Sequence, residues 1–142
     1  METWMITGVT GFLGPRVEVT LREKGEVEVL PMTREELNFT DEEQVKRVLG
    51  TLHPDVLVHA AAVSDTGACE RDPEGSWKVN VTGVEYLSKA CRENGTKLIF
   101  ASSDQVYTGS EVRTPHREDE ILTPANVYGR EKLEAERIVA NW

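Results

Sequence analysis

The segment Trp4-Met5-Ile6-Thr7-Gly8-Val9-Thr10-Gly11-Phe12-Leu13-Gly14 decides the fold. It starts as an apolar strand and continues into a turn in which Gly8, Gly11 and Gly14 are spaced three residues apart. A tight turn, close approach of a backbone to a pyrophosphate, and close contact between helix and sheet each need a glycine. The helix that follows points free amide groups and the positive end of its dipole at an anion. The segment therefore predicts a dinucleotide site, and a purely structural turn is the alternative.

Strands and helices alternate along the rest of the chain. The run Val56-Leu57-Val58-His59-Ala60-Ala61-Ala62 is continuously apolar around one histidine, which is typical of a strand covered on both faces. The patterns predict strands at residues 3–7, 27–30, 56–62 and 97–101, helices at 16–24, 41–49, 73–94 and 126–142, and a surface loop at 108–124. Val19 and Trp77 are expected to face inward from their helices. This order predicts an α/β fold, a doubly wound parallel sheet (Rossmann fold), in one domain spanning residues 1–142, with ligands beyond the strands' carboxyl ends.

Composition narrows the range of partners. The chain has 142 residues and a net charge of −9, from 25 acidic and 16 basic residues, which argues against nucleic acid or an anionic membrane. A site for one small anion remains open, because it needs only local donors. Cys69 and Cys91 are expected to be packing thiols in a reducing compartment, and His53 and His59 lack a partner at metal-ligand spacing, so no metal is expected. With no basic leader and no long apolar run, a soluble cytoplasmic protein is expected.

A second group of residues carries acid-base chemistry. Tyr128 and Lys132 are four apart on a predicted helix, so their side chains share one face. A tyrosine pKa lies near ~10, and a nearby ammonium favours the phenolate, which would move the pKa of Tyr128 down toward working range. Ser103 follows a strand and could donate a second hydrogen bond to the same substrate oxygen. Taken alone, this pair of residues also occurs by chance on many helix surfaces.

Five motifs occur together and in a known order. They are the glycine spacing of residues 8–14, His59-Ala60-Ala61-Ala62, Val79-Asn80-Val81, Ser102-Ser103-Asp104-Gln105-Val106-Tyr107, and Tyr128-Gly129-Arg130-Glu131-Lys132. The whole chain thereby resembles the extended short-chain dehydrogenases/reductases, the NAD-dependent epimerase/dehydratase superfamily. It looks most like the dTDP-4-dehydrorhamnose reductase branch, because of Ser103-Asp104-Gln105-Val106-Tyr107-Thr108-Gly109 and Pro124-Ala125-Asn126-Val127-Tyr128-Gly129.

The resemblance implies a role for each matching residue. Tyr128 would donate the proton, Lys132 would hold the cofactor ribose and tune Tyr128, and Ser103 would be the catalytic serine, with Ser102 a weaker candidate. The residues implied to line the pyrophosphate are Gly8, Gly11, Phe12, Leu13 and Gly14. Around the rest of the cofactor, the resemblance implies that Asn38 and Phe39 touch the adenine. It also implies that Ala60, Ala61 and Ala62 lie behind the cofactor, and that Asn80 orders the active-site backbone.

Two departures from the family pattern affect specificity. The second strand ends in Met32-Thr33-Arg34, where many NAD-using members place an acidic residue for the ribose 2′-hydroxyl. Without that carboxylate, Arg34 favours NADP, with NAD as the alternative; an ordinary solvated arginine is the plainer interpretation. The segment Asp65-Thr66-Gly67-Ala68-Cys69-Glu70 differs from the branch's usual sequence, so the sugar stays open.

The third departure is the end of the chain at Trp142, where family members continue into a C-terminal part that grips the nucleotide sugar. The expectation is that this substrate-binding part is absent, and that a longer chain or a second polypeptide completes the site. A homo-oligomer is the other partner considered. The expected function is an NAD(P)-dependent oxidoreductase that reduces a nucleotide-linked 4-keto sugar. The alternatives are a nucleotide-sugar epimerase or dehydratase, and a non-catalytic NADP-binding regulatory subunit like that of methionine adenosyltransferase.

Overall fold

A single parallel sheet organises the part of the chain that the computed structural model describes, residues 1–108 and 114–141. Its strands lie in the order β2-β1-β3-β4, and every neighbouring pair is parallel. The strands are β1 (Glu2–Thr7), β2 (Val27–Pro31), β3 (Val56–His59) and β4 (Lys97–Phe100). After β2 the chain returns past β1 to form β3, so its direction of winding reverses between β1 and β3. The predicted Rossmann-type fold is confirmed.

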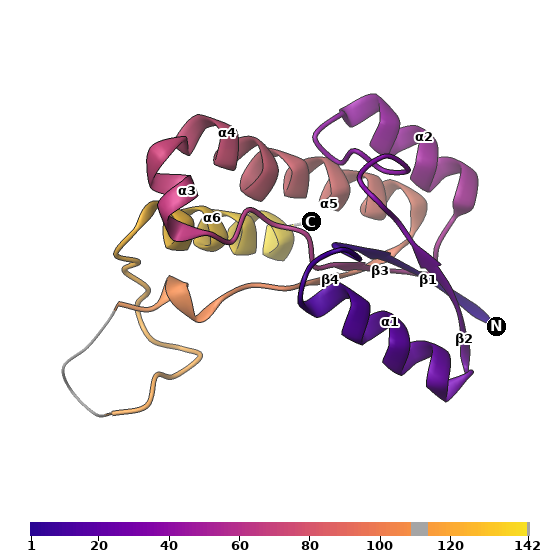
Figure 1. The fold of residues 1–142 in the computed structure, drawn as a ribbon, viewed down its shortest axis with the longest axis horizontal. Helices are drawn as coiled ribbons and strands as arrows, with labels where there is room; N and C mark the ends of the chain where they lie inside the picture. Colours follow the sequence, from indigo (N-terminus) through magenta and orange to yellow (C-terminus); the bar gives the residue numbers. More distant parts are fainter. Residues whose placement is uncertain (109–113, 142) are drawn as a thin grey trace.

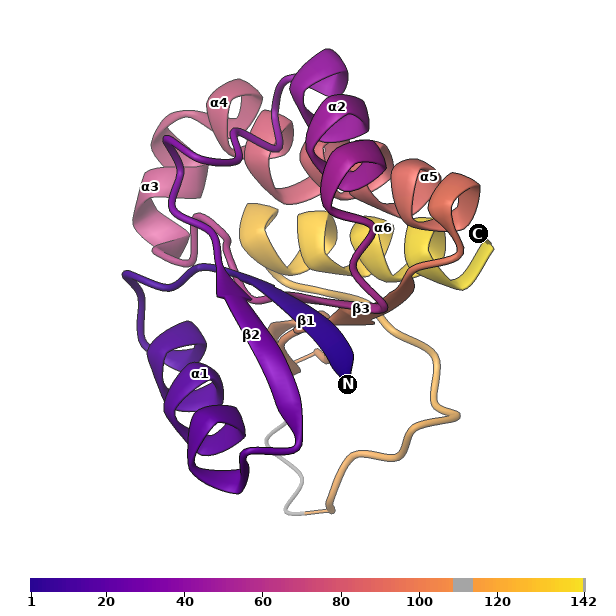
Figure 2. The ribbon, with the colours of Figure 1, turned by 90° about the vertical axis from the view of Figure 1, so that its right-hand side faces the viewer.

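Helices cover both faces of this sheet, as Figures 1 and 2 show: α1 packs on one face, and α2, α5 and α6 pack on the other. The helices are α1 (Leu13–Lys24), α2 (Glu42–Leu52), α3 (Thr66–Arg71), α4 (Pro73–Trp77), α5 (Gly83–Asn94) and α6 (Val127–Asn141). A π-helical turn, η1 (Lys78–Thr82), joins α4 to α5, and a 3-10 turn, η2 (Asp104–Val106), follows β4.

Adjacent residues of β1 are buried on opposite sides of the sheet. Met5 packs with Leu49 and Leu87 under α2 and α5, whereas Ile6 packs with Val29 and Val58, against which residues of α1 also pack. All four residues of β3 are buried. Double coverage therefore explains why each strand carries three consecutive apolar residues, 4–6 in β1 and 56–58 in β3, instead of alternating with polar ones.

Several sequence-based expectations need correction. The strand at 56–62 ends at His59, so Ala60, Ala61 and Ala62 form an irregular segment past the sheet. The helix at 73–94 contains the π-helical turn, and the short helix α3 was not predicted. Val19 and Trp77 are 54% and 45% exposed, so neither faces the core as expected. A helical turn accommodates such apolar side chains on its outer face at small cost.

The predicted loop at 108–124 is irregular in its described residues, and Gly109 and Trp142 lie outside the described residues. None of the helices in residues 1–108 and 114–141 is both long and apolar enough to span a bilayer.

Candidate functional site

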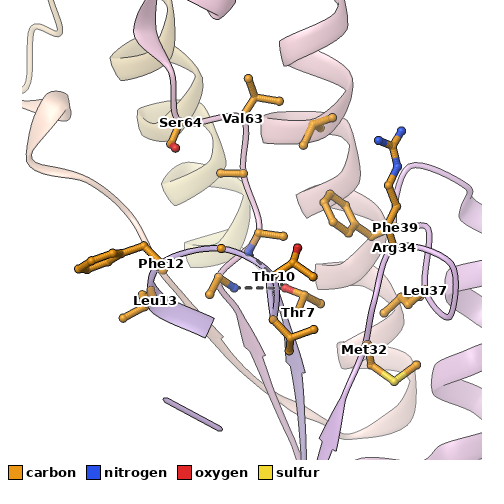
Figure 3. Close-up of a pocket in the computed structure, with 18 of the residues that line it drawn as sticks. Thr7, Thr10, Phe12, Leu13, Met32, Arg34, Leu37, Phe39, Val63 and Ser64 are labelled. Carbon is orange, nitrogen blue, oxygen red and sulfur yellow. Dashed lines mark hydrogen bonds between the residues drawn. The ribbon is translucent and has the colours of Figure 1, made fainter. Parts of the chain in front are cut away.

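A cleft of about 470 Å³ opens at the carboxyl ends of β1, β2 and β3, where the winding of the chain reverses. Figure 3 shows the glycine turn on one side of it and the segment after β2 on the other. This is where open α/β sheets bind their ligands. Twelve of the predicted site residues line the cleft: Gly8, Gly11, Phe12, Leu13, Arg34, Asn38, Phe39, Ala60, Ala61, Ala62, Tyr128 and Lys132.

The glycine turn leaves no room for a side chain at two positions. Gly8 has φ +73°, and a Cβ there would lie 2.7 Å from backbone atoms of Ala60 and Ala61. Gly14 is buried behind the cleft surface, where a Cβ would lie 2.1 Å from the Gly8 carbonyl oxygen. The Gly11 amide donates to the same oxygen at 3.1 Å. The turn therefore needs glycine for space as well as for backbone conformation.

The N-terminus of α1 faces the cleft, and no described side chain offsets the positive end of its dipole. Phe12 occupies the N-cap position, no described side chain caps the helix, and no acidic residue lies in the first turn. The Arg16 guanidinium stacks on the Phe12 ring, 3.8 Å from its centroid. Free amides at a helix N-terminus attract anions. This end of the cleft fits the pyrophosphate of a dinucleotide.

Thr7 and His59 join the ends of β1 and β3 at the floor of the cleft. The Thr7 Oγ1 and His59 Nδ1 atoms are 2.7 Å apart, and the Ala60 amide donates to Thr7 Oγ1 at 3.2 Å. Burial, with a smaller effect of the Lys132 charge, lowers the pKa of His59 to about 3, so the ring is neutral at physiological pH. The prediction that His59 is a packing residue is confirmed, but its bond to Thr7 could not be predicted from sequence spacing.

Lys132 is a buried cation at the side of the cleft opposite the glycine turn. Its side chain is 3% exposed, and Nζ donates to the Ala101 carbonyl at 2.6 Å and lies 4.2 Å from the centroid of the Phe100 ring. Burial lowers the pKa of Lys132 to about 8. The ammonium is thus held in place by β4 and its following residue, with its remaining donors available to the cleft.

Tyr128 shares this wall of the cleft, and its pKa moves in the direction opposite to the one predicted. Burial raises the pKa of Tyr128, and a side-chain hydrogen bond with Ser103 partly opposes that rise. The expectation that Lys132 lowers it is not met, because the Lys132 ammonium is directed to Ala101. A phenol with a raised pKa keeps its proton at neutral pH and can donate it.

The two candidate serines differ in their surroundings. Ser103 Oγ accepts from the Gln105 amide at 3.2 Å and caps η2, and Ser103 is not among the residues that line the cleft. Ser102 does line the cleft, and its Oγ donates to Glu136 at 2.5 Å. The Ser103 side chain nonetheless acts on the pKa of Tyr128, which favours Ser103 as the partner of the phenol.

Asn80 lies behind the wall of the cleft instead of on its surface. It is 2% exposed, its Oδ1 accepts from the Val63 amide at 2.8 Å, and its Nδ2 donates to the Val63 carbonyl at 2.9 Å. Both polar atoms of the Val63 peptide unit are thereby satisfied, which holds the irregular segment after β3 in one conformation.

A carboxylate closes the turn that follows β2, beyond the segment 32–34 that lacks an acidic residue. Glu36 Oε2 accepts from the Thr33 amide at 2.8 Å and from Thr33 Oγ1 at 2.9 Å. Arg34 is exposed, lines the cleft and makes no hydrogen bond or ion pair with residues 1–108 or 114–141. The spacing Thr33-Arg34-Glu35-Glu36 is that of a capping box, which is the sequence signal that could have identified this contact.

Two further acidic residues of the site region were missed. Glu70 Oε1 accepts from the Val127 amide at 2.7 Å, so a residue of α3 caps the helix that carries Tyr128. Glu131 is 1% exposed and accepts from Ser76 Oγ at 2.7 Å, and burial raises its pKa. No local pattern indicates either contact, because each partner comes from another part of the chain.

The remaining titratable candidates play no part in the cleft. His116 pairs with Glu120 and stacks on Tyr107, with ring centroids 4.5 Å apart. Cys69 and Cys91 are buried free thiols, and burial raises the pKa of Cys91 to about 12. The described residues contain no group of His, Cys, Asp and Glu side chains that could hold a metal ion.

The fold and the cleft define a Rossmann-type α/β protein. The chain belongs to the family described as RmlD substrate binding domain, whose model matches residues 2–142. The resemblance to the dTDP-4-dehydrorhamnose reductase branch is thereby confirmed.

Similar proteins include reductases and a subunit of methionine adenosyltransferase. The chain is 32% identical over 139 residues to a dTDP-4-dehydrorhamnose reductase of Aggregatibacter actinomycetemcomitans, covering 98% of this chain and 47% of that protein. It is 37% identical to methionine adenosyltransferase 2 subunit beta of Xenopus laevis, over 95% of this chain and 42% of that protein. A Bacillus anthracis dTDP-4-dehydrorhamnose reductase, solved in complex with NADP, matches with a TM-score of 0.93 and 27% identity, over 99% and 50% of the two chains. The chain thus spans about half the length of the curated relatives it matches.

Proposed function

We propose that residues 1–142 form the cofactor-binding half of an NADP-dependent reductase that acts on a nucleotide-linked 4-keto sugar, with NAD as the alternative cofactor. One observation carries the proposal. The cleft joins an uncapped helix N-terminus and a glycine turn at one side to Tyr128 and Lys132 at the other. The relatives named reductases, one of them bound to NADP, support the same chemistry.

The residues fit a dinucleotide along the whole cleft. The glycine turn and the first amides of α1 would receive the pyrophosphate, Asn38 and Phe39 would lie at the adenine, and Lys132 would hold the second ribose. When bound, the nicotinamide supplies the hydride for the carbonyl carbon.

Tyr128 then has one task, the donation of a proton to the carbonyl oxygen as negative charge develops there. Its raised pKa keeps the phenol protonated before the reaction, and Ser103 is the side chain that would orient its hydroxyl. The buried Lys132 ammonium stabilises negative charge that appears in this wall of the cleft, since a cation acts more strongly where water is excluded.

The test replaces Tyr128 by Phe in the full-length protein and follows NADPH oxidation with a dTDP-linked 4-keto sugar. We expect turnover to fall roughly 100-fold or more, as loss of a general acid does, with NADPH affinity nearly unchanged. Tyr86→Phe is the matched control, because Tyr86 loses the same atom on α5, outside the cleft, and should keep normal turnover. Near-normal turnover of Tyr128→Phe would refute the role of proton donor, and turnover of sugar without net NADPH consumption would indicate an epimerase or dehydratase.

A second candidate function is a non-catalytic cofactor-binding subunit, favoured by the 37% identity to methionine adenosyltransferase 2 subunit beta. Mixing the protein with a methionine adenosyltransferase catalytic subunit distinguishes the two functions. A stable complex with altered synthetase activity, and no reduction of keto sugars, would support the regulatory function.

A further inference from the structure

The turn after β2 is closed by a reciprocal pair of contacts between Thr33 and Glu36. The Leu37 amide donates to the Thr33 carbonyl at 2.9 Å, which makes residues 33–37 a single helical turn. Glu36 Oε2 accepts from both the amide and the hydroxyl of Thr33, and the Glu36 amide donates to Thr33 Oγ1 at 3.3 Å. Thr33 lines the cleft, so this turn forms part of its wall.

These contacts place negative charge at donors that an anion would otherwise use. A backbone amide and a hydroxyl at the start of a helical turn are favourable phosphate ligands. Here both point at one carboxylate oxygen, and these hydrogen bonds lower the pKa of Glu36. Glu36 is therefore ionised at neutral pH.

Arg34 provides the opposite charge in the same turn. Its side chain is exposed and unpaired within the described ranges, and Figure 3 shows its guanidinium extending beside Phe39 from the end of β2. In this fold the end of the second strand lies at the adenosine ribose, where a carboxylate suits the 2′-hydroxyl of NAD and an arginine suits the 2′-phosphate of NADP. The turn thus presents both kinds of charge within four residues of sequence, 33–36.

We propose that Glu36 is a specificity-determining residue that limits binding of the 2′-phosphate of NADP, by occupying the two Thr33 donors and by opposing the charge of Arg34. The proposal rests on the proposed function, because it assumes that the cleft binds a nicotinamide dinucleotide. Glu36 therefore sets how strongly this protein prefers one cofactor over the other, and Arg34 alone does not decide it.

The experiment titrates the purified protein with NADPH and with NADH by calorimetry, and compares wild type with Glu36→Gln. Gln keeps an oxygen that can accept from Thr33 but removes the charge. We expect NADPH affinity to rise about fivefold, the effect of one like charge removed near a surface phosphate, while NADH affinity changes by less than about twofold. The gain should shrink at high salt, which screens exposed charges.

Glu35→Gln is the matched control. Glu35 is exposed and makes no hydrogen bond or ion pair with residues 1–108 or 114–141, so this substitution removes the same charge one position away without affecting Thr33. We expect its effect on NADPH affinity to be smaller than that of Glu36→Gln. Arg34→Ala is the positive control and should weaken NADPH binding with little change for NADH.

The outcomes separate this inference from the proposed function. Equal effects of Glu36→Gln and Glu35→Gln, equal changes for NADPH and NADH, or an Arg34→Ala variant with an unchanged NADPH-to-NADH ratio would each overturn the role of Glu36 and leave the reductase proposal standing. If wild type bound neither dinucleotide, both proposals would fall.

Discussion

One end of the cleft is built from a single continuous segment, residues 4–14, whereas the other end is assembled from β4, α3 and α6. At the glycine turn the contacts are local: the Gly11 amide donates to the Gly8 carbonyl, and Gly14 packs on the same carbonyl. At the other end, Lys132 is held by Ala101, and the helix that carries Tyr128 is capped by Glu70. The first end depends on backbone space, and the second depends on docking of distant elements.

This difference decides what kind of change each end tolerates. Backbone atoms cannot move away from an added methyl group without unfolding the turn. A single substitution at the glycine end should therefore have a large effect on stability. Side-chain contacts between elements can be lost one at a time. Each single substitution at the other end should therefore have a small effect on stability. The contact between Thr7 and His59 joins β1, which leads into the glycine turn, to β3.

The largest effect is expected for Gly14→Ala, which tests the glycine end. A Cβ 2.1 Å from the Gly8 carbonyl oxygen forces the turn apart, and we expect the free energy of unfolding to fall by about 3 kcal/mol, with NADPH binding lost. Urea denaturation and calorimetric titration measure the two effects.

Gly50→Ala is the control for the same substitution in an open position. Gly50 lies on α2, with the nearest atom, Asn94 Oδ1, 3.9 Å from an added Cβ, so stability should stay equal or rise by up to about 1 kcal/mol. A Gly14→Ala protein as stable as Gly50→Ala would show that the turn is not constrained by space.

An intermediate effect is expected at His59, the buried residue that joins β3 to Thr7 of β1. The unfolded chain binds a proton near pH 6.5, but the folded protein does not until about pH 3, because burial disfavours the imidazolium. The contribution of His59 to the free energy of unfolding is therefore complete above pH 6.5. It is lost as the pH falls from 6.5 toward about 3, by up to about 1.4 kcal/mol per pH unit. Urea denaturation at a series of pH values measures the slope.

His59→Asn should flatten that slope, since asparagine does not titrate and can still present a polar atom to Thr7. His53→Asn is the control, because His53 is exposed and lies at the C-cap of α2 in a left-handed conformation that asparagine tolerates. If both variants retained the wild-type slope, another group would be responsible for the acid sensitivity.

The smallest effect is expected for Glu70→Ala, which tests the assembled end. Removing the cap of α6 should cost about 1 kcal/mol, and turnover should fall roughly threefold because Tyr128 follows the capped residue Val127. Denaturation and steady-state kinetics provide the two measurements. Glu93→Ala removes an exposed carboxylate from α5, away from the cleft, and should change neither value appreciably.

Much of the fold could be predicted, because apolar runs and helical periodicity are local properties. The strands were predicted within a few residues, although the third was expected to extend to Ala62. The helix α3 was missed because it is short and buries only Cys69. Trp77 was expected inside and is exposed, since α4 turns it away from the core that Val81 and Val84 enter.

The sequence by itself determined the glycine turn, the parallel sheet and the pairing of Tyr128 with Lys132 on one helix face, because each follows from residue spacing within one segment. Only the tertiary structure decided that Tyr128 has a raised pKa, that Lys132 is directed to Ala101, and that Glu36 meets Thr33. Burial and long-range hydrogen bonds set these properties, and both depend on which segments pack together in space.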